Sequence, residues 1–169
     1  MDDMLRWITY IVIGLVVLAA ASVLAGQLGW FTGQAPTDLG VNDGKLKAPS
    51  TAPNSVSSQA DLWPGHPRAQ QAQIAPLPVQ GGDAAATMAA LLEVVRTAPG
   101  AQVMTARPDY IYAQFKTPLM KYTDDVEFWL APGASVIHVR SASRLGESDM
   151  GANRQRIEAL RAHLAQRLR

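Results

Sequence analysis

The sequence predicts an α+β protein in which a single N-terminal transmembrane helix precedes a small antiparallel sheet, of three to four strands, packed with two helices. Three observations support this fold class. Residues 8–31 are apolar and uncharged. Short segments after residue 100 alternate polar and apolar residues between turn signals, and a helical pattern lies on either side of them. Because strands and helices do not alternate along the chain, a layered α+β arrangement is expected.

Composition excludes several classes of protein. The chain has 169 residues with 15 Lys+Arg and 14 Asp+Glu, and this balance gives no support to general nucleic-acid binding. Without cysteine, the chain cannot form a disulfide framework, a thiolate nucleophile or a cysteine-ligated metal site. The G-x-S-x-G, P-loop and H-E-x-x-H motifs are absent. We therefore expect no cofactor and no metal.

The N-terminal segment predicts a membrane anchor over residues 1–31. It contains the run ITYIVIGLVVLAAASVLAGQLGWF, and no charge occurs between Arg6 and Asp38. An apolar stretch of about 20 residues allows a helix to cross about 30 Å of hydrocarbon. Aromatic residues typical of the membrane interface bracket the run, namely Trp7, Tyr10, Trp30 and Phe31.

A cleaved signal peptide is the alternative, because Val23-Leu24-Ala25 resembles a small-residue cleavage site. Against it, the first six residues carry two acids and one arginine, and the apolar run is long for a signal peptide. The flanking charges hardly discriminate the orientation. A short N-terminal tail followed by one span and a globular body favours a single-pass protein with its N-terminus inside the cell and its domain outside.

Residues 32–82 hold seven of the eleven prolines and show neither helical nor strand period, which indicates extended chain or loop. Apolar residues in the second half indicate that it lies against a domain: Leu62, Trp63, Ile74, Leu77 and Val79. The compact domain begins near Asp83, a typical N-cap, with a helix that Pro99-Gly100 ends. Strands are expected at 101–106, 110–117, 124–130 and 135–143, and a last helix at 149–168.

Apolar side chains must oppose one another across the last hairpin, formed by residues 124–130 and 135–143. The tightest register places Leu130 opposite Ser135. On the buried side the pairs are then Phe128 with Ile137, Val126 with Val139, and Asp124 with Ser141. On the other side they are Trp129 with Val136, Glu127 with His138, and Asp125 with Arg140.

The expected pair of Glu127 and His138 has two interpretations. It is typical of acid/base chemistry or of half a metal site. It is more commonly a surface cross-strand pair, which contributes about 0.2–1 kcal/mol. The second interpretation is favoured, because a lone histidine with carboxylates lacks the three ligands of a catalytic zinc.

The corner between the last strand and the last helix concentrates polar residues. The apolar stripe of that helix consists of Met150, Ile157, Leu160, Leu164 and Leu168, and Asn153 lies on it. A buried amide without partners costs about 1–3 kcal/mol. We therefore expect a structural polar network that fastens helix to sheet, with Ser148 or Asp149 capping the helix; its members are Asp124, Ser141, Ser143, Asp149 and Asn153.

A ligand site is the alternative at the same corner. Arg140, Arg144 and the free N–H groups at the helix start would bind an anion. Arg144 discriminates between the two interpretations. If it turns onto Asp124 it is structural, and if it is free beside the helix it binds a ligand.

The exposed side of the last helix is expected to be basic, with Arg154, Arg156, Arg161, Arg167 and Arg169. Such a face could lie on anionic lipid near the anchor. A solvated helix exterior is the commoner case, because arginine is a good helix former.

Several stretches resemble the domain-of-unknown-function family 1499, found in bacterial envelopes and plastids. They are DDVEF at 124–128, IHVRSASRLGESDMGANRQR at 137–156, PNSVSSQA at 53–60 and IAPL at 74–77. The resemblance extends from about Leu39 to the C-terminus and implies that 53–60 belongs to the domain. The expected organisation is thus an anchor at 1–31, a linker at 32–52 and a domain at 53–169, of which 53–82 is largely irregular and packed on 83–169. No catalytic residues can be carried over, because the family brings no established reaction.

The chain departs from this family at two positions. The family usually carries a cysteine where Ser55 stands and another near Pro49, and both are missing here. Their joint loss fits a lost disulfide and leaves the segment around Asn54 held by packing alone.

These observations support three functions. The first is a non-catalytic, membrane-anchored binding or assembly module of the cell envelope, which contacts lipid through the anchor and binds an anionic ligand or an envelope protein. The second is a hydrolase that uses Asp124 or Asp125 with Arg140 and Arg144. The third is a domain that binds anionic lipid surfaces through the arginine-rich helix.

Overall fold

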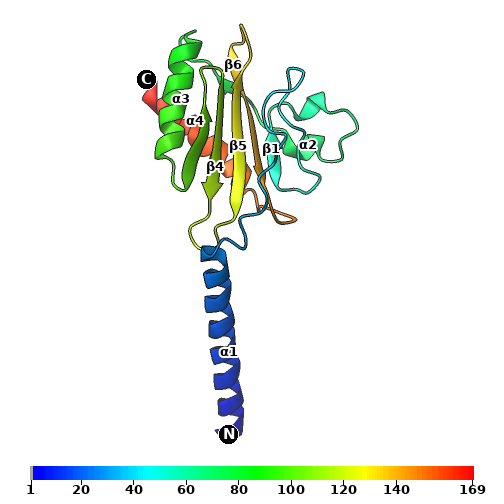
Figure 1. Ribbon diagram of the computed structural model, residues 1–169, viewed down its shortest axis with the longest axis vertical. Coiled ribbons are helices and arrows are strands. Elements are labelled where there is room, and N and C mark those ends of the chain that lie inside the picture. Colours follow the sequence, from blue (N-terminus) through cyan, green and yellow to red (C-terminus); the bar gives the residue numbers. More distant parts are fainter. Residues whose placement is uncertain (1) are drawn as a thin grey trace.

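The computed structural model describes residues 2–169 and confirms the α+β class (Figure 1). α1 (Asp2–Gln27) extends from one end of the domain that the rest of the chain forms. It is the one described helix that is long and apolar enough to cross a membrane, and its most apolar window has no buried residue. In a water-soluble domain such a surface would be covered by packing, so the helix is suited to a lipid environment.

The domain is built on one antiparallel sheet. Its four long strands lie where the alternation predicts them: β3 (Ala101–Ala106), β4 (Tyr110–Lys116), β5 (Thr123–Leu130) and β6 (Val136–Ser143). Two short strands, β1 (Ser55–Ser57) and β2 (Leu77–Pro78), both pair with β6. The order is β1-β6-β5-β4-β3, so the sheet has six strands rather than the three or four expected.

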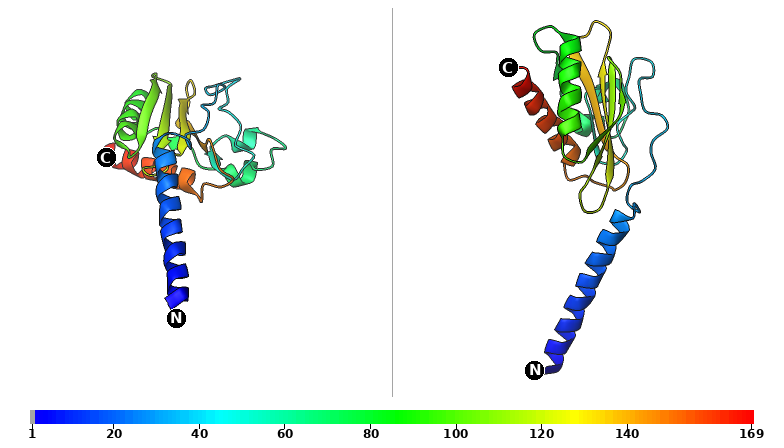
Figure 2. Two further views of the ribbon diagram at one scale, coloured as in Figure 1. Left: turned by 60° about the horizontal axis from the view of Figure 1, so that its bottom comes forward. Right: turned by 60° about the vertical axis from the view of Figure 1, so that its left-hand side comes forward.

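Two helices cover one face of this sheet, which we call the helix face (Figure 2). α3 (Ala84–Thr97) begins at Asp83, whose carboxylate accepts a hydrogen bond from the Ala86 N–H, as expected for its N-cap. α4 (Ala152–Arg167) packs beside it. Apolar side chains of both helices and of β4, β5 and β6 form one buried core, in which Phe128, Ile137, Val139 and Ile157 are fully buried.

α4 begins later than the sequence predicts. Met150 and Gly151 have positive φ angles, so the helix starts at Ala152 rather than near residue 149. Met150 is 93% exposed and does not belong to the apolar stripe, contrary to expectation. The remaining stripe residues face the core, with Asn153 fully buried among them.

The segment expected to be irregular contains short elements held by tertiary pairing. These are β1, β2, a turn of 3-10 helix at Ala60–Leu62, and α2 (Ala69–Ala72). Three residues are too few to show a period, so the sequence pattern could not reveal strands of this length. Farther toward the N-terminus, residues 34–50 cross the sheet on its second face, which we call the outer face (Figure 2). There Leu46 is fully buried against Tyr110 and Trp129.

The predicted register of the last hairpin is wrong by two residues. Leu130 lies opposite Ile137 instead of Ser135. Val136 pairs with Pro78 of β2, and the Ser135 carbonyl bonds to the chain just after β2, so both belong to a second ladder. Because the shift is two, every side chain keeps its predicted face. The actual neighbours are Asp124–Ser143, Asp125–Ala142, Val126–Ser141, Glu127–Arg140, Phe128–Val139 and Trp129–His138.

Candidate functional site

The polar residues of the predicted corner lie on both faces of the sheet. Successive side chains of a strand point to opposite faces, so Asp124 lies on the helix face and Asp125 on the outer face. Both carboxylates are buried. The sheet therefore separates two sets of ion pairs, and the two carboxylates lie on the faces that the alternation predicted.

On the helix face, Asn153 is the centre of a polar network. Its Oδ1 accepts a hydrogen bond from Ser141 Oγ at 2.5 Å. Its Nδ2 lies 2.9 Å from the Asn54 carbonyl, 3.0 Å from Ser143 Oγ and 2.8 Å from Asp149 Oδ2. These contacts join α4, β6 and the residue preceding β1, and they use every hydrogen-bonding atom of the buried amide.

Asp149 caps the start of α4 from just outside the helix. Its carboxylate accepts hydrogen bonds from the backbone N–H groups of Gly151, at 2.9 Å, and Asn153, at 2.8 Å. Burial alone would raise the pKa of Asp149, but these bonds and the one from the Asn153 side chain outweigh it and lower that pKa. The carboxylate thus stabilises the helix start in its charged form.

The arginine that meets Asp124 is Arg156 of α4, which pairs with that carboxylate at 2.5 Å. Neither alternative for Arg144 is met, because Arg144 pairs with Asp125 instead. Arg156 also donates to Asn153 Oδ1 at 2.8 Å and stacks over the ring of Phe115 at 4.9 Å. Its assignment to the exposed helix side is therefore wrong. The signal was present in the sequence, because Arg156 follows the buried Asn153 by three residues and shares its side of the helix.

On the outer face, Arg144 forms a two-point ion pair with Asp125. Its Nε donates to Asp125 Oδ2 and its Nη2 to Asp125 Oδ1, both at 2.8 Å. The Tyr112 hydroxyl donates to the same carboxylate at 2.6 Å. The hydrogen bonds from Arg144 to Asp125 raise the pKa of Arg144. Burial and the hydrogen bond to Asp125 raise the pKa of Tyr112.

The second outer-face ion pair, Glu127 with Arg140, has no direct hydrogen bond between its two charged groups. Glu127 Oε1 accepts hydrogen bonds from the Tyr110 hydroxyl and the Gly40 N–H, each at 2.7 Å. Glu127 Oε2 lies 3.5 Å from Arg140 Nη1 and accepts no hydrogen bond from any residue that the structure describes. Burial lowers the pKa of Arg140, and the charge of Glu127 opposes that effect. Burial, followed by the charge of Glu127, raises the pKa of Tyr110.

Arg140 retains unused hydrogen-bond donors. Its Nε donates to the Ala48 carbonyl at 3.2 Å. Within residues 2–169 its two terminal amino groups form no hydrogen bond, although the side chain is only 5% exposed. A guanidinium carries five N–H donors, so most of those of Arg140 are available to another partner.

A pocket of about 210 Å³ opens beside these groups, between the outer face and the segment that crosses it. It brings together Arg140 and Arg144, the two residues expected to bind a ligand, and adds Lys47. Lys47 forms an ion pair with Asp38 at 2.5 Å, and that hydrogen bond lowers the pKa of Asp38. Three cations therefore line one small cavity, each beside a carboxylate.

Sequence reasoning missed Lys47, Tyr110 and Tyr112 as members of this site. The two tyrosines alternate with the apolar residues of β4, so strand parity already placed them opposite the core. Their contact with Glu127 and Asp125 depends on the β4–β5 register, which the sequence did not fix. Nothing in the local sequence of Lys47 indicates that it lies over β6.

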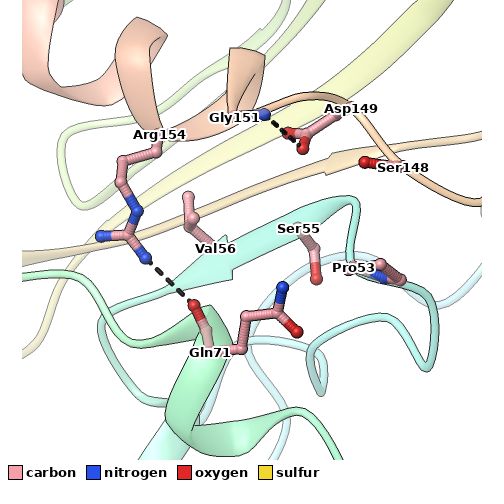
Figure 3. Close-up of a pocket in the computed structure, with 8 residues that line it drawn as sticks. All are labelled: Pro53, Ser55, Val56, Gln71, Ser148, Asp149, Gly151 and Arg154. Carbon is pink, nitrogen blue, oxygen red and sulfur yellow. Dashed lines mark hydrogen bonds between the residues drawn. The ribbon is translucent and has the colours of Figure 1, made fainter.

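A second cavity, of about 260 Å³, lies between β1, α2 and the start of α4 (Figure 3). Arg154 reaches across it and donates to the backbone carbonyls of Gln71, at 3.1 Å, and Gln73, at 2.8 Å. Ser55 also lines this cavity, and its hydroxyl accepts a hydrogen bond from the Ser50 N–H at 2.8 Å. The segment around Asn54 is thus held by hydrogen bonds as well as by packing.

Two further interpretations of the sequence need correction. His138 lies opposite Trp129, stacks on its ring and contacts Ser58 Oγ at 3.3 Å, so it does not pair with Glu127. Burial lowers the pKa of His138. On α4, Arg161 donates to the carbonyls of Ala75 and Pro76, so it binds the domain instead of forming a free basic face.

No group of three or more His, Asp or Glu side chains within the described residues has the arrangement of a metal site. Asp124 and Asp125, the candidates for a hydrolase, are each bonded to an arginine. The arrangement therefore offers hydrogen-bond donors to an anion more readily than a free carboxylate to a reaction.

The chain matches a known protein family. Residues 45–164 match the family described as "Protein of unknown function (DUF1499)". No curated protein matches the chain. The match covers well over half of the sequence, and it includes both short strands, the whole sheet and most of α4.

Proposed function

Because the chain belongs to the DUF1499 family, which is described as of unknown function, we propose its function from the site. It is a membrane-anchored, non-catalytic module that binds a small anion in the outer-face pocket. The observation that carries this proposal is the buried Arg140 side chain, which lines the pocket with Arg144 and Lys47 and whose terminal amino groups form no hydrogen bond within residues 2–169. Desolvated guanidinium donors favour a carboxylate or phosphate group.

The proposed anchor is α1, retained as part of the mature protein. The possible cleavage site, Val23-Leu24-Ala25, lies inside this helix. Cleavage there would cut the helix just before Gly26 and Gln27, and these two residues hold the end of the helix against the domain. With the acidic N-terminal tail, these contacts support retention of the anchor. The order of a short N-terminal tail, one span and a globular domain supports a single-pass protein of the bacterial inner membrane with its domain in the periplasm.

The size and charge of the pocket limit the ligand. A volume near 210 Å³ suits a small anion rather than a drug-sized molecule. Arg140 and Arg144 are each held beside a buried carboxylate, whereas the Lys47–Asp38 pair is more exposed. An exposed ion pair contributes little to stability, so Lys47 can exchange Asp38 for a bound anion at low cost.

Calorimetric titration of the full chain in neutral detergent micelles, at constant ionic strength, tests this function with inorganic phosphate and succinate as probes. We expect saturable binding of at least one of them. Lys47→Met removes one charge-assisted hydrogen bond and should weaken the binding about tenfold or more. Arg140→Lys keeps the positive charge beside Glu127 but loses the planar guanidinium, which can donate two parallel hydrogen bonds to an anion. This variant should therefore also weaken the binding.

Lys116→Met is the matched control, because Lys116 is exposed at the end of β4 and lies outside the pocket. This variant should bind as the unmodified chain does. Absence of binding with both probes, or an equal loss in Lys47→Met and Lys116→Met, would contradict the proposed function.

A further inference from the structure

The turn between β4 and β5, residues 117–122, is attached to the C-terminal end of α1 (Figure 1). The Gln27 side chain donates to the backbone carbonyls of Pro118, at 3.1 Å, and Leu119, at 2.8 Å. Within the turn, the N–H groups of Lys121 and Tyr122 bond to Thr117. Several backbone groups of the turn therefore have hydrogen-bond partners from the protein itself, which lowers the cost of placing the turn in lipid.

The contact between α1 and this turn is close. Gly26 is buried, and a Cβ atom at that position would lie 2.8 Å from both Cα and the carbonyl oxygen of Met120. Only glycine permits this approach. One turn later Phe31 stacks on Tyr122, with their ring centroids 5.4 Å apart. The helix end and the turn thus form one packed unit.

Large apolar side chains remain exposed around this unit. Leu119 at the tip of the turn is 64% exposed, and Leu28 and Trp30 just beyond α1 are 66% and 75% exposed. These three side chains lie where the apolar span ends. Gln27 is the last residue of the span and bonds directly to Leu119, and Leu28 and Trp30 follow it in the chain. Tryptophan at the end of a span is typical of the membrane interface.

We propose that the β4–β5 turn inserts Leu119 into the same leaflet from which α1 emerges, so that the domain rests on the bilayer at two points. This inference rests on the membrane-anchor part of the proposed function. The occupant of the surface is lipid rather than a second protein, because the exposed side chains continue the apolar surface of the span itself. Two attachment points fix the orientation of the domain relative to the membrane, which one helix would leave free to rotate.

The absence of cysteine in the chain allows single labels to be placed without background. Leu119→Cys, Ser135→Cys and Leu15→Cys variants of the full chain would carry an environment-sensitive fluorophore in phosphatidylcholine vesicles. Ser135 is exposed in the β5–β6 connection, at the end of the sheet away from α1 (Figure 1). We expect lipid-attached nitroxides to quench the label at 119 several-fold more than that at 135, and aqueous iodide to do the opposite.

The label at position 15 separates failure of this inference from failure of the anchor. If lipid nitroxides quench position 15 while position 119 behaves like position 135, α1 spans the membrane and the turn does not dock. If iodide reaches positions 15 and 119 equally, the anchor itself is wrong and this inference falls with it.

A matched pair of helix variants tests the mechanism of docking. Gly26→Leu should displace the turn, and the quenching of the label at 119 by lipid nitroxides should fall toward the value at 135. Gly14→Leu introduces the same side chain where no atom lies within 4 Å, and it should leave that quenching unchanged. Equal quenching in the two variants would show that the close contact with α1 does not hold the turn at the membrane, which would overturn the two-point arrangement.

Discussion

Ser141 of β6 and Asn153 of α4 hydrogen-bond across the interface between sheet and helix, with 2.5 Å between Ser141 Oγ and Asn153 Oδ1. Both side chains are fully buried. In a core otherwise made of aliphatic and aromatic groups, a polar contact of this kind fixes how far α4 is rotated and shifted along the sheet. Any other position would leave buried polar atoms without partners.

Replacing Asn153 should therefore destabilise the domain. In Asn153→Ala the Asn54 carbonyl loses the Asn153 amide as a partner, and we expect the free energy of unfolding to fall by about 2–3 kcal/mol. Urea unfolding of the full chain in neutral detergent, followed by tryptophan fluorescence, measures this loss. Gln155→Ala, an exposed site on the same helix, should change the free energy by less than about 0.5 kcal/mol. Similar losses in both variants would contradict the central role of Asn153.

The ion pair of Asp124 and Arg156 should show strong coupling. Removal of one partner leaves the other charge in a buried site, so Asp124→Asn and Arg156→Met should each cost about 3 kcal/mol. The double variant leaves no unpaired charge and should lose clearly less than the two single losses combined. Unfolding measurements on all four proteins give the coupling energy. Simple additivity would mean that the two side chains do not stabilise the fold as a pair.

Strand parity explains both the success and the failure of the sequence-based interpretation of this region. Alternation alone placed Phe128, Val139 and Ser141 on the helix face, and the helical period placed Asn153 opposite them. Parity does not distinguish registers that differ by two residues. The register depends on β2, a two-residue strand about 60 residues earlier in the chain, which no local pattern reveals.

The partners of the arginines were also beyond local prediction. Arg140, Arg144 and Arg156 each meet a carboxylate, but which one depends on register and on the turn before α4. Long side chains reach several acceptors from one backbone position, so sequence could identify the set of charges without identifying the pairs. The outer-face pocket depends in addition on residues 34–50, whose path over the sheet is set by contacts such as the burial of Leu46.

The Tyr110 hydroxyl should contribute measurably to stability through Glu127. It donates to a buried carboxylate at 2.7 Å, and a hydrogen bond to a charged group contributes about 1.5–3 kcal/mol. Tyr110→Phe should lower the free energy of unfolding by about that amount, because Glu127 Oε1 would keep only the Gly40 N–H as a donor. Tyr122→Phe is the control, since its side chain is exposed. Thermal unfolding monitored by circular dichroism compares the two, and a loss in Tyr122→Phe as large as that in Tyr110→Phe would contradict this explanation.

The cap of α4 should make stability depend on pH in a defined direction. The pKa of Asp149 in the folded chain lies below its ordinary value near 3.8, because the hydrogen bonds from Asn153 and Gly151 favour the carboxylate. A lowered folded-state pKa means that the unfolded chain binds the proton more readily. The stabilisation is then fully present above pH 3.8 and is lost as the pH falls through the folded-state pKa.

Asp149→Asn removes this charge and should destabilise the chain at pH 7. The difference in the free energy of unfolding between the variant and the unmodified chain should narrow as the pH is lowered from 5 toward 2.5, because the unfolded chain takes up a proton on this carboxyl more readily than the folded chain does. Urea unfolding at several pH values measures the gap. Glu147→Gln, an exposed carboxylate in the same loop, should produce no such gap at any pH. A gap for Asp149→Asn that stays constant from pH 7 to 2.5 would show that the charge of Asp149 does not stabilise the start of α4.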